Sequence, residues 1–418
     1  MAEVRLGSSI PRHPPAGASA GPPDPGPRRR GFLALGFRPF FLVAGLLAVL
    51  SMLLWLGTLF GWVAPPAYLA GTNWHAHEML FGYAAAVIAG FLLTAARNWS
   101  GLPTASGPLL AALVGLWLAA RLAPWFQAPA WLIGALDIAF FPALAASLWR
   151  PLWQGPNPAN RLFLAVFSGF TLAALLVDLD GMGLVSGLAA RGQRLMLDLI
   201  VVVMLLVGGR VMPFFTRAAL PGAKPVTRPW LDALTFGAAL AMLALHLAPA
   251  GAGPGGEAVA RLAGIAALAA GLLQLVRLAG WHDRRAWGNP MLAVLYLGFL
   301  WLAAGLVLDG LAAFGLLPPS IAVHALTAGA IGVLTLGMMT RVTLGHTGRA
   351  MRASAPTVVA FALVNAAALL RTVGVWLAPQ AYRDWLIAAG ACWIAAFVLF
   401  VVVYGPMLVA PRVDGKPG

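Results

Sequence analysis

The sequence is poor in cysteine and in charge. Cys392 is the single cysteine in 418 residues, so an intrachain disulfide and a cysteine-rich zinc or iron–sulfur site within one subunit are excluded. Charged residues make up only 10% of the chain, whereas hydrophobic residues make up 61% and the mean hydropathy is +0.86. Soluble chains carry about 25% charged residues. The composition therefore excludes an ordinary soluble protein and indicates a membrane protein.

Acidic residues are scarce as well. Thirteen Asp and Glu stand against 27 Lys and Arg, which gives a net charge of +14. Such an excess can serve nucleic-acid binding, but these basic residues lie in short clusters between apolar runs, as is typical of membrane-protein loops. We therefore expect the lipid bilayer as a partner and no nucleic acid.

Residues 1–30 lack a periodic apolar pattern. They are rich in Pro, Gly and Ala and end in three consecutive arginines. Because such a segment cannot bury a core, we predict a disordered cytoplasmic arm over residues 1–30 and a single transmembrane bundle over residues 31–418.

Apolar runs of membrane-spanning length recur along the rest of the chain. They predict an all-α, polytopic membrane helix bundle with about 12 transmembrane helices. We expect helices at about 38–60, 74–96, 107–123, 129–149, 160–178, 194–216, 229–248, 258–280, 290–314, 319–343, 354–378 and 385–410.

The distribution of basic residues gives an orientation. With a cytoplasmic N-terminus, the inner flanks of these helices hold 21 of the 27 Lys and Arg residues and the outer flanks hold six. This asymmetry follows the positive-inside rule, and an odd number of helices would spoil it. Both termini are therefore expected in the cytoplasm.

Three histidines share one level near the outer face. His75 and His77 lie in the first turn of the second expected helix, and His324 lies in the first turn of the tenth, which runs in the same direction. Polar side chains at the start of a spanning helix are costly unless they have a task or a partner. These histidines are therefore candidate ligands.

Helical geometry separates the neighbouring pair. At 100° per residue His75 and His77 point 200° apart, so a regular helix cannot turn both toward one metal. Small side chains follow His75 and His324 along their helices, and we favour these two as the facing pair. Neutral imidazole is a good ligand for haem iron and copper. The alternative is that the histidines cap helix starts and bind interfacial water.

Several charged residues inside the expected helices are further candidates. Glu78 is suited to orienting an imidazole or moving protons. Asp137 and Asp309 are suited to a proton path or to pairing with an arginine of another helix. Arg194 and Asp198 lie four residues apart and are expected to form a plain ion pair.

Arg210 and Arg217 flank a proline at the inner end of the sixth expected helix. Two interpretations remain open. The side chains either snorkel to the interface or clamp a propionate or another anion.

Several motifs, in this order, resemble the NnrS family. They are LGFRPFF at 35–41, WHAHEMLFG at 74–82, GFLLTA at 90–95, RVMPFFT at 210–216, HALTAGA at 324–330 and RVTLGHTGR at 341–349. The resemblance runs from about residue 31 to the C-terminus.

The resemblance implies a bacterial inner-membrane protein that contains haem and copper and takes part in the nitric oxide response and the relief of nitrosative stress. We expect nitric oxide or a small redox ligand to be bound, or one-electron chemistry to take place, at the outer-side histidines, with an unidentified electron donor. Whether the chain is an enzyme stays open. The implied ligand candidates are His75, His77 and His324, and the supporting candidates are Glu78, Arg210, Arg217 and His346.

Two other hypotheses compete with this one. A twelve-helix secondary transporter without haem would suit the topology, although residues 98–106 lack the charges typical of major-facilitator loops. A membrane-embedded assembly subunit is the third. The haem–copper oxidases offer a looser analogy, but no histidine cluster occurs between residues 194 and 245, so their three-histidine copper site is missing.

Overall fold

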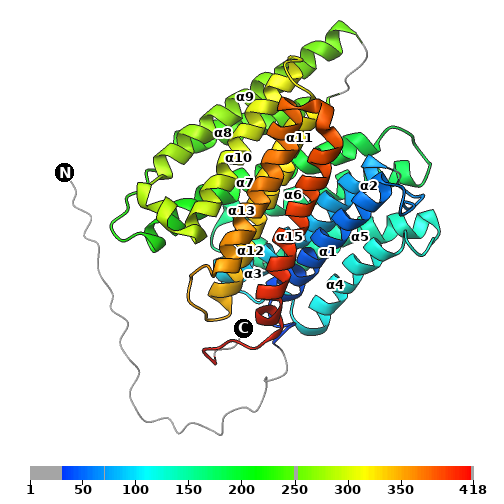
Figure 1. Cartoon of the computed structure of the whole chain (residues 1–418). Helices are drawn as coiled ribbons and strands as arrows, with labels where there is room; N and C mark the ends of the chain where they lie inside the picture. The colour runs from blue at the N-terminus through cyan, green and yellow to red at the C-terminus, as the bar shows by residue number, and fades with distance from the viewer. Residues whose placement is uncertain (1–30, 70, 249–252, 416–418) are drawn as a thin grey trace, which may run out of the picture.

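A computed structural model describes residues 31–69, 71–248 and 253–415, and the regular structure in these ranges is helical (Figure 1). Eleven of the described helices are long and apolar enough to cross a bilayer, and a twelfth, α4 (Gly107–Leu122), is apolar but shorter. The prediction of an all-α polytopic membrane bundle of about twelve helices is confirmed. The arm expected at residues 1–30 lies outside the described residues.

The spans follow the expected order, with some divided into consecutive elements. The long ones are α1 (Phe37–Leu59), α3 (Ala85–Ser100), α5 (Ala130–Trp153), α6 (Leu162–Gly181), α7 (Ala189–Ala219), α8 (Pro229–Leu247), α9 (Pro254–Trp281), α10 (Pro290–Ala313), α12 (Gly332–His346), α13 (Ala355–Leu369) and α15 (Tyr382–Val409). The short ones are α2 (Thr72–His77), α11 (Pro319–His324) and α14 (Val375–Leu377).

Local sequence signals set many helix ends. Proline occupies the first turn of α8, α9 and α10, where its missing N–H costs nothing. The side chain of Asn289 accepts a hydrogen bond from the backbone N–H of Met291 (3.1 Å) at the start of α10. Gly101 ends α3 in the left-handed conformation that glycine adopts without strain.

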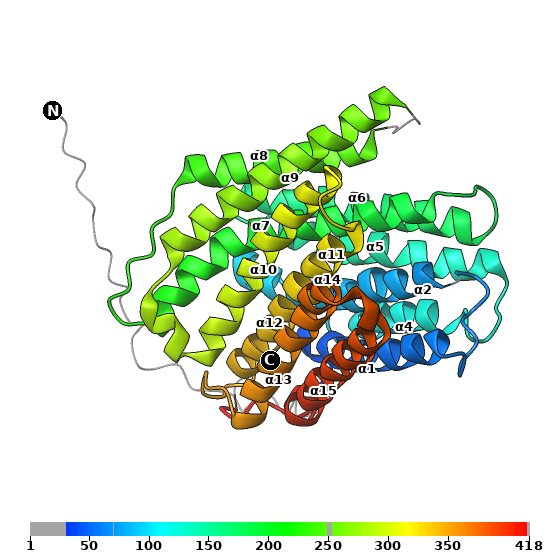
Figure 2. The same ribbon diagram turned by 45° about the horizontal axis from the view of Figure 1, so that its top comes forward.

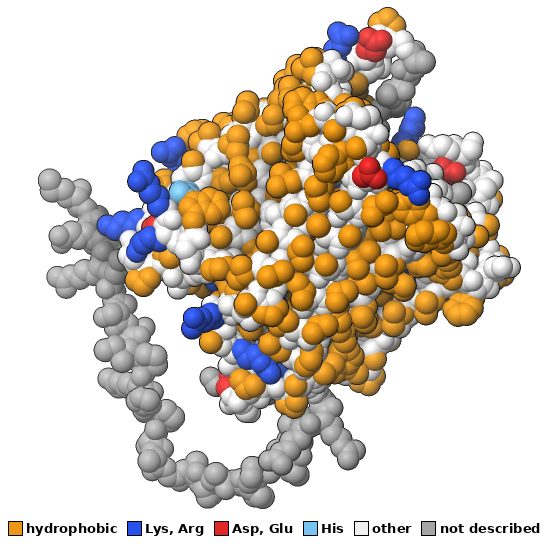
Figure 3. Space-filling view, in the orientation of Figure 1, with side chains coloured by type: hydrophobic (Ala, Val, Ile, Leu, Met, Phe, Trp, Pro, Cys, Tyr) orange, Lys and Arg blue, Asp and Glu red, His pale blue; other side chains and the backbone are white. Residues whose placement is uncertain are grey.

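The helices that carry the candidate histidines lie inside the bundle. In the most apolar part of the span Thr72–Ser100, 83% of the residues are buried within the protein, against 22% for Pro229–Leu247. Figures 1 and 2 show the pair α8 and α9 at one edge, α4 and α5 at the opposite edge, and α7 running between them. Charged side chains on the face in Figure 3 gather toward the rims of a broad apolar surface, as expected for a lipid-facing wall.

The start of the first span is hydrogen-bonded to the end of the last span. The guanidinium of Arg38, at the start of α1, donates hydrogen bonds to the carbonyl oxygens of Leu408 (2.9 Å) and Ala410 (2.6 Å), at the end of α15. The first span therefore begins on the side of the membrane where the last span ends. This arrangement requires an even number of crossings.

The two histidine-bearing spans are not regular α-helices. The segment α2 continues into a π-helical turn, η1 (Glu78–Ala84), and α11 continues into a second one, η4 (Ala325–Ile331). The expectation of 100° per residue is therefore wrong beyond His77 and beyond His324. A π-turn rotates the residues that follow it, and such turns occur frequently at functional sites.

Candidate functional site

A cavity of about 500 Å³ lies at the end of the bundle where α2, α7 and α11 begin. Its wall is mostly apolar and is built by six segments distant in sequence: α1, α2 with η1, α7, α11 with η4, α13 with its continuation η5 (Leu370–Gly374), and α15. Both His75 and His324 line it. The structure therefore brings the favoured pair of histidines to one internal space, which we call the histidine cavity.

Packing holds the His75 ring in place. The imidazole stacks on the indole of Trp55 from α1, with ring centroids 4.7 Å apart and an interplanar angle of 11°. Its Nδ1 atom is buried without a hydrogen-bond partner among the described residues. Buried nitrogens are normally satisfied, so an unpaired one in a cavity wall indicates a group suited to a ligand.

A backbone contact fixes the tautomer of His324. Its Nδ1 lies 2.6 Å from the carbonyl oxygen of Ser320, one turn earlier in α11. Because a carbonyl only accepts, Nδ1 must carry the proton, and Nε2 of the neutral ring keeps its lone pair. Histidine ligands of metals are usually oriented by such a contact at the second ring nitrogen.

Two arginines line the apolar cavity, and of these Arg371 has no carboxylate partner among the described residues. Arg371 donates to the hydroxyl of Tyr382 through Nη2 (3.3 Å), and its Nη1 is buried with no hydrogen-bond partner in the part of the chain that the structure describes. Arg194 lines the cavity from α7. Guanidinium groups suit carboxylates particularly well, because two N–H groups can donate in parallel.

Arg194 belongs to an ion-pair network. It donates to Asp198 at 3.0 Å, as predicted, and to both carboxylate oxygens of Asp309, at 2.9 and 2.5 Å. His246 of α8 lies 2.8 Å from the other oxygen of Asp198. Of the two roles open for Asp309 from the sequence, the structure shows the ion pair with an arginine of another helix.

His77 faces a different environment on the opposite side of α2. Its Nε2 is hydrogen-bonded to Asp137 Oδ2 (2.8 Å) and its Nδ1 to Glu78 Oε1 (3.2 Å). Arg121 of α4 pairs with both of these carboxylates, and the His77 ring stacks on Phe81. All four groups of this cluster are buried. Asp137 therefore has an arginine partner, and the imidazole that Glu78 contacts is that of His77.

Asp178 of α6 completes this His77 cluster. One potential metal-ligand atom from each of His77, Asp137 and Asp178 lies within 4.8 Å of the other two, a spacing that could hold a metal ion. The hydroxyl of Tyr68 donates to Asp178 Oδ1 (3.0 Å), while Oδ2 is buried without a partner among the described residues. Burial and the Asp178 carboxylate raise the pKa of Tyr68 far above its ordinary value, so this hydroxyl remains a donor.

The inner-face candidates lie elsewhere. Arg210 donates to the side-chain oxygen of Asn160 (2.8 Å), Arg217 is exposed, and the His346 ring packs against Phe37 with centroids 5.5 Å apart. None of Arg210, Arg217 and His346 is among the described residues that line the histidine cavity. The anion-clamp interpretation of the two arginines stays a prediction.

The sequence reasoning missed Arg121, Arg371 and Asp178 as site residues. A usable signal existed for the arginines. Of the six basic residues on the outer flanks, Arg121, Arg194 and Arg371 are the three that line the histidine cavity or join the His77 cluster. Half of the basic residues that break the positive-inside rule thus have partners or line a cavity inside the bundle.

The fold and the site together define a polytopic helical membrane protein with a histidine-lined internal cavity. A sequence model of the family described as NnrS protein matches residues 31–412. The chain therefore belongs to the NnrS family, and this membership supports a role in the nitric oxide response. No curated protein sequence matches the chain.

Proposed function

We propose that the protein binds haem in the histidine cavity and acts on or senses nitric oxide there, in a bacterial inner membrane with both chain termini in the cytoplasm. The observation that carries the proposal is that His75 and His324, from spans distant in sequence, line one cavity, with Nδ1 of His75 unpaired among the described residues and Nδ1 of His324 held by Ser320 so that Nε2 keeps its lone pair. Membership of the NnrS family does not favour a haem-free transporter.

The cavity suits the group. Its volume of about 500 Å³ falls within the range of about 300–1,000 Å³ typical of cofactor sites, and its wall combines apolar side chains with a few polar groups. The guanidinium of Arg371 complements a carboxylate, a group that a haem carries as its propionates, whereas the guanidinium of Arg194 already pairs with Asp198 and Asp309. When bound, haem would supply one-electron exchange and, where one of the two imidazoles gives up its place, a binding position for nitric oxide.

The chain's own residues perform the positioning. The Ser320 carbonyl holds the His324 ring with Nε2 available, and Trp55 holds the ring of His75 by stacking. Asp198 and Asp309 hold the guanidinium of Arg194. Leu197 and Ile331 contribute apolar wall that excludes water. Ligands held by such partners need little reorganisation when they bind.

For copper we propose the His77 cluster. One imidazole and two carboxylates are a donor set that accommodates a divalent copper ion, and three carboxylates there face one guanidinium, so the cluster has negative charge to spare. His77 engages both ring nitrogens with carboxylates, so a metal would replace at least one of these contacts.

The test is a reduced-minus-oxidised absorption spectrum with iron and copper analysis on detergent-purified full-length protein, recorded with and without nitric oxide. We expect a haem Soret band that nitric oxide shifts. We also expect the Asp178→Asn variant to lose copper and to keep its haem, because Asp178 does not line the histidine cavity. Protein that stays colourless after ample haem supply would refute the proposal.

A further inference from the structure

A second, smaller cavity of about 90 Å³ lies between α3, α7, α10 and α12. Apolar side chains line it, together with Thr335. The hydroxyl of Thr335 donates to the carbonyl oxygen of Ile331 (2.6 Å) and is also hydrogen-bonded to Tyr83 (2.5 Å). Its hydrogen and one of its lone pairs are therefore used, and the rest of the lining is apolar, so the cavity offers little that would bind water.

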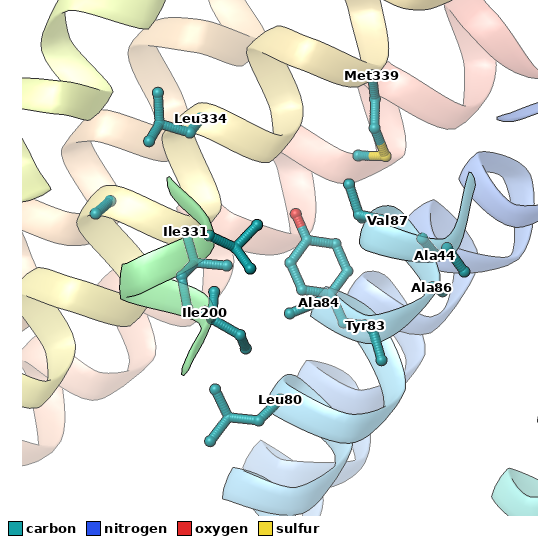
Figure 4. Packing of buried hydrophobic residues seen from close by; sticks show 14 of the residues in the cluster. Ala44, Leu80, Tyr83, Ala84, Ala86, Val87, Ile200, Ile331, Leu334 and Met339 are labelled. Atoms are coloured by element: carbon teal, nitrogen blue, oxygen red, sulfur yellow. The ribbon is translucent and has the colours of Figure 1, made fainter. Parts of the chain in front are cut away.

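This apolar cavity adjoins the histidine cavity. The side chain of Ile331 lines both spaces. Along α7, Leu197 lines the histidine cavity and Ile200, one turn further on, lines the apolar cavity. Figure 4 shows Ile331 and Ile200 opposite Tyr83 and Ala84 in the packed core. The wall between the two spaces is therefore about one side chain thick.

The opposite side of the apolar cavity lies near the lipid. Ile88, Met204 and Val207 line it and are only half-buried, whereas Ile200 and Ile331 are buried. All five residues lie within membrane-spanning helices. Between the lipid and the wall of the histidine cavity, the lining of the apolar cavity is therefore apolar apart from Thr335.

We propose that the apolar cavity holds small uncharged gas molecules in transit between the bilayer and the histidine cavity. Dry cavities lined by leucine, isoleucine and phenylalanine bind xenon and similar apolar species. At about 90 Å³ the space is several times larger than a single water-sized probe requires, which is about 10–15 Å³. The identification of nitric oxide as the physiological occupant rests on the proposed function, whereas the binding of an inert gas in this cavity does not depend on it.

Xenon is the probe. We expect crystals of the full-length protein under xenon pressure to show an anomalous peak between Ala84, Ile200 and Ile331. The Val207→Phe variant fills the cavity from its half-buried side and should lose the peak. The Leu300→Phe variant adds the same ring type at a lipid-exposed position of α10 and should keep it. If Val207→Phe does not fold, Val203→Phe fills the same space.

A second measurement tests transit. In haem-loaded protein, rebinding of nitric oxide after flash photolysis should be slower in the Val207→Phe variant than in wild type and in Leu300→Phe. Absence of the xenon peak in wild type would overturn the proposal. So would unchanged rebinding in a variant that has lost the peak. Since xenon binding needs no haem, failure of haem binding leaves the first measurement intact.

Discussion

Replacing His324 by Ala is expected to abolish haem binding. The substitution removes the nitrogen that the Ser320 carbonyl keeps oriented, and the same loss is expected for His75→Ala. Loss of a residue that merely orients a metal ligand typically costs about 10–100-fold in affinity, so loss of a ligand should cost at least about 100-fold. The measurement is a titration of purified protein with haem, followed at the Soret band.

Two further variants serve as controls for this titration. His346→Ala alters a histidine packed on Phe37 and outside the described cavity wall, so its haem affinity should stay unchanged. His77→Gln should also retain the Soret band, because His77 faces Asp137 and Glu78. A Soret band retained in both His75→Ala and His324→Ala, but lost in His77→Gln, would move the haem to the His77 cluster.

The Arg121→Leu variant is expected to be strongly destabilised. Arg121 is buried, with 5% of its side chain exposed, and pairs with Glu78 and Asp137, which are equally buried. Removing one partner of a buried ion pair leaves an uncompensated charge and costs about 3–5 kcal/mol. Asp178, also in the cluster, adds to the negative charge left behind. We expect a lower midpoint of thermal unfolding in detergent.

An exposed pair provides the comparison. Arg261 pairs with Glu257 on α9, where the two side chains are 62% and 71% exposed. Exposed ion pairs contribute about 0–1 kcal/mol, so Arg261→Ala should leave the unfolding midpoint nearly unchanged. The triple variant Arg121→Leu, Glu78→Gln, Asp137→Asn should recover part of the lost stability, because it removes two of the stranded charges. Equal midpoints for Arg121→Leu and Arg261→Ala would contradict this description of the cluster.

The fold was predictable because lipid imposes simple demands. Every span needs about 20 apolar residues, and Lys and Arg collect on the cytoplasmic side. The lengths of the apolar runs and the positions of the basic residues therefore predicted about twelve helices and a cytoplasmic N-terminus. Among the described spans, the short helix α4 is also the one that holds Arg121. Its length and its buried charge are local features that hydropathy describes poorly.

The site was predictable only in part. The sequence predicted that His75 and His77 point in different directions and that His75 faces His324, because those predictions depend only on the first turn of each helix. The sequence could not show that π-turns begin at Glu78 and Ala325, since no residue type marks them. Likewise, which arginine meets Asp137 depends on how α4 packs against α5, a contact that forms only in the folded bundle.

The short helix α2 contributes a histidine to each of the two proposed cofactor sites. His75 on one face of α2 lines the histidine cavity, and His77 on the other joins Asp137 and Arg121. The π-turn η1 then directs Tyr83 to the cavity and leaves Ala84 at the neighbouring apolar space. The positions of both proposed cofactor sites are therefore fixed by the same segment of backbone.

The most direct test is a cryo-electron microscopy map of the full-length protein, expressed with ample haem and copper and reconstituted in lipid nanodiscs. The account predicts flat macrocycle density inside the histidine cavity, contacted by the imidazoles of His75 and His324, with density for a separate ion beside His77 and Asp178. A map with haem bound elsewhere, or with lipid filling the histidine cavity in protein that contains haem, would contradict it.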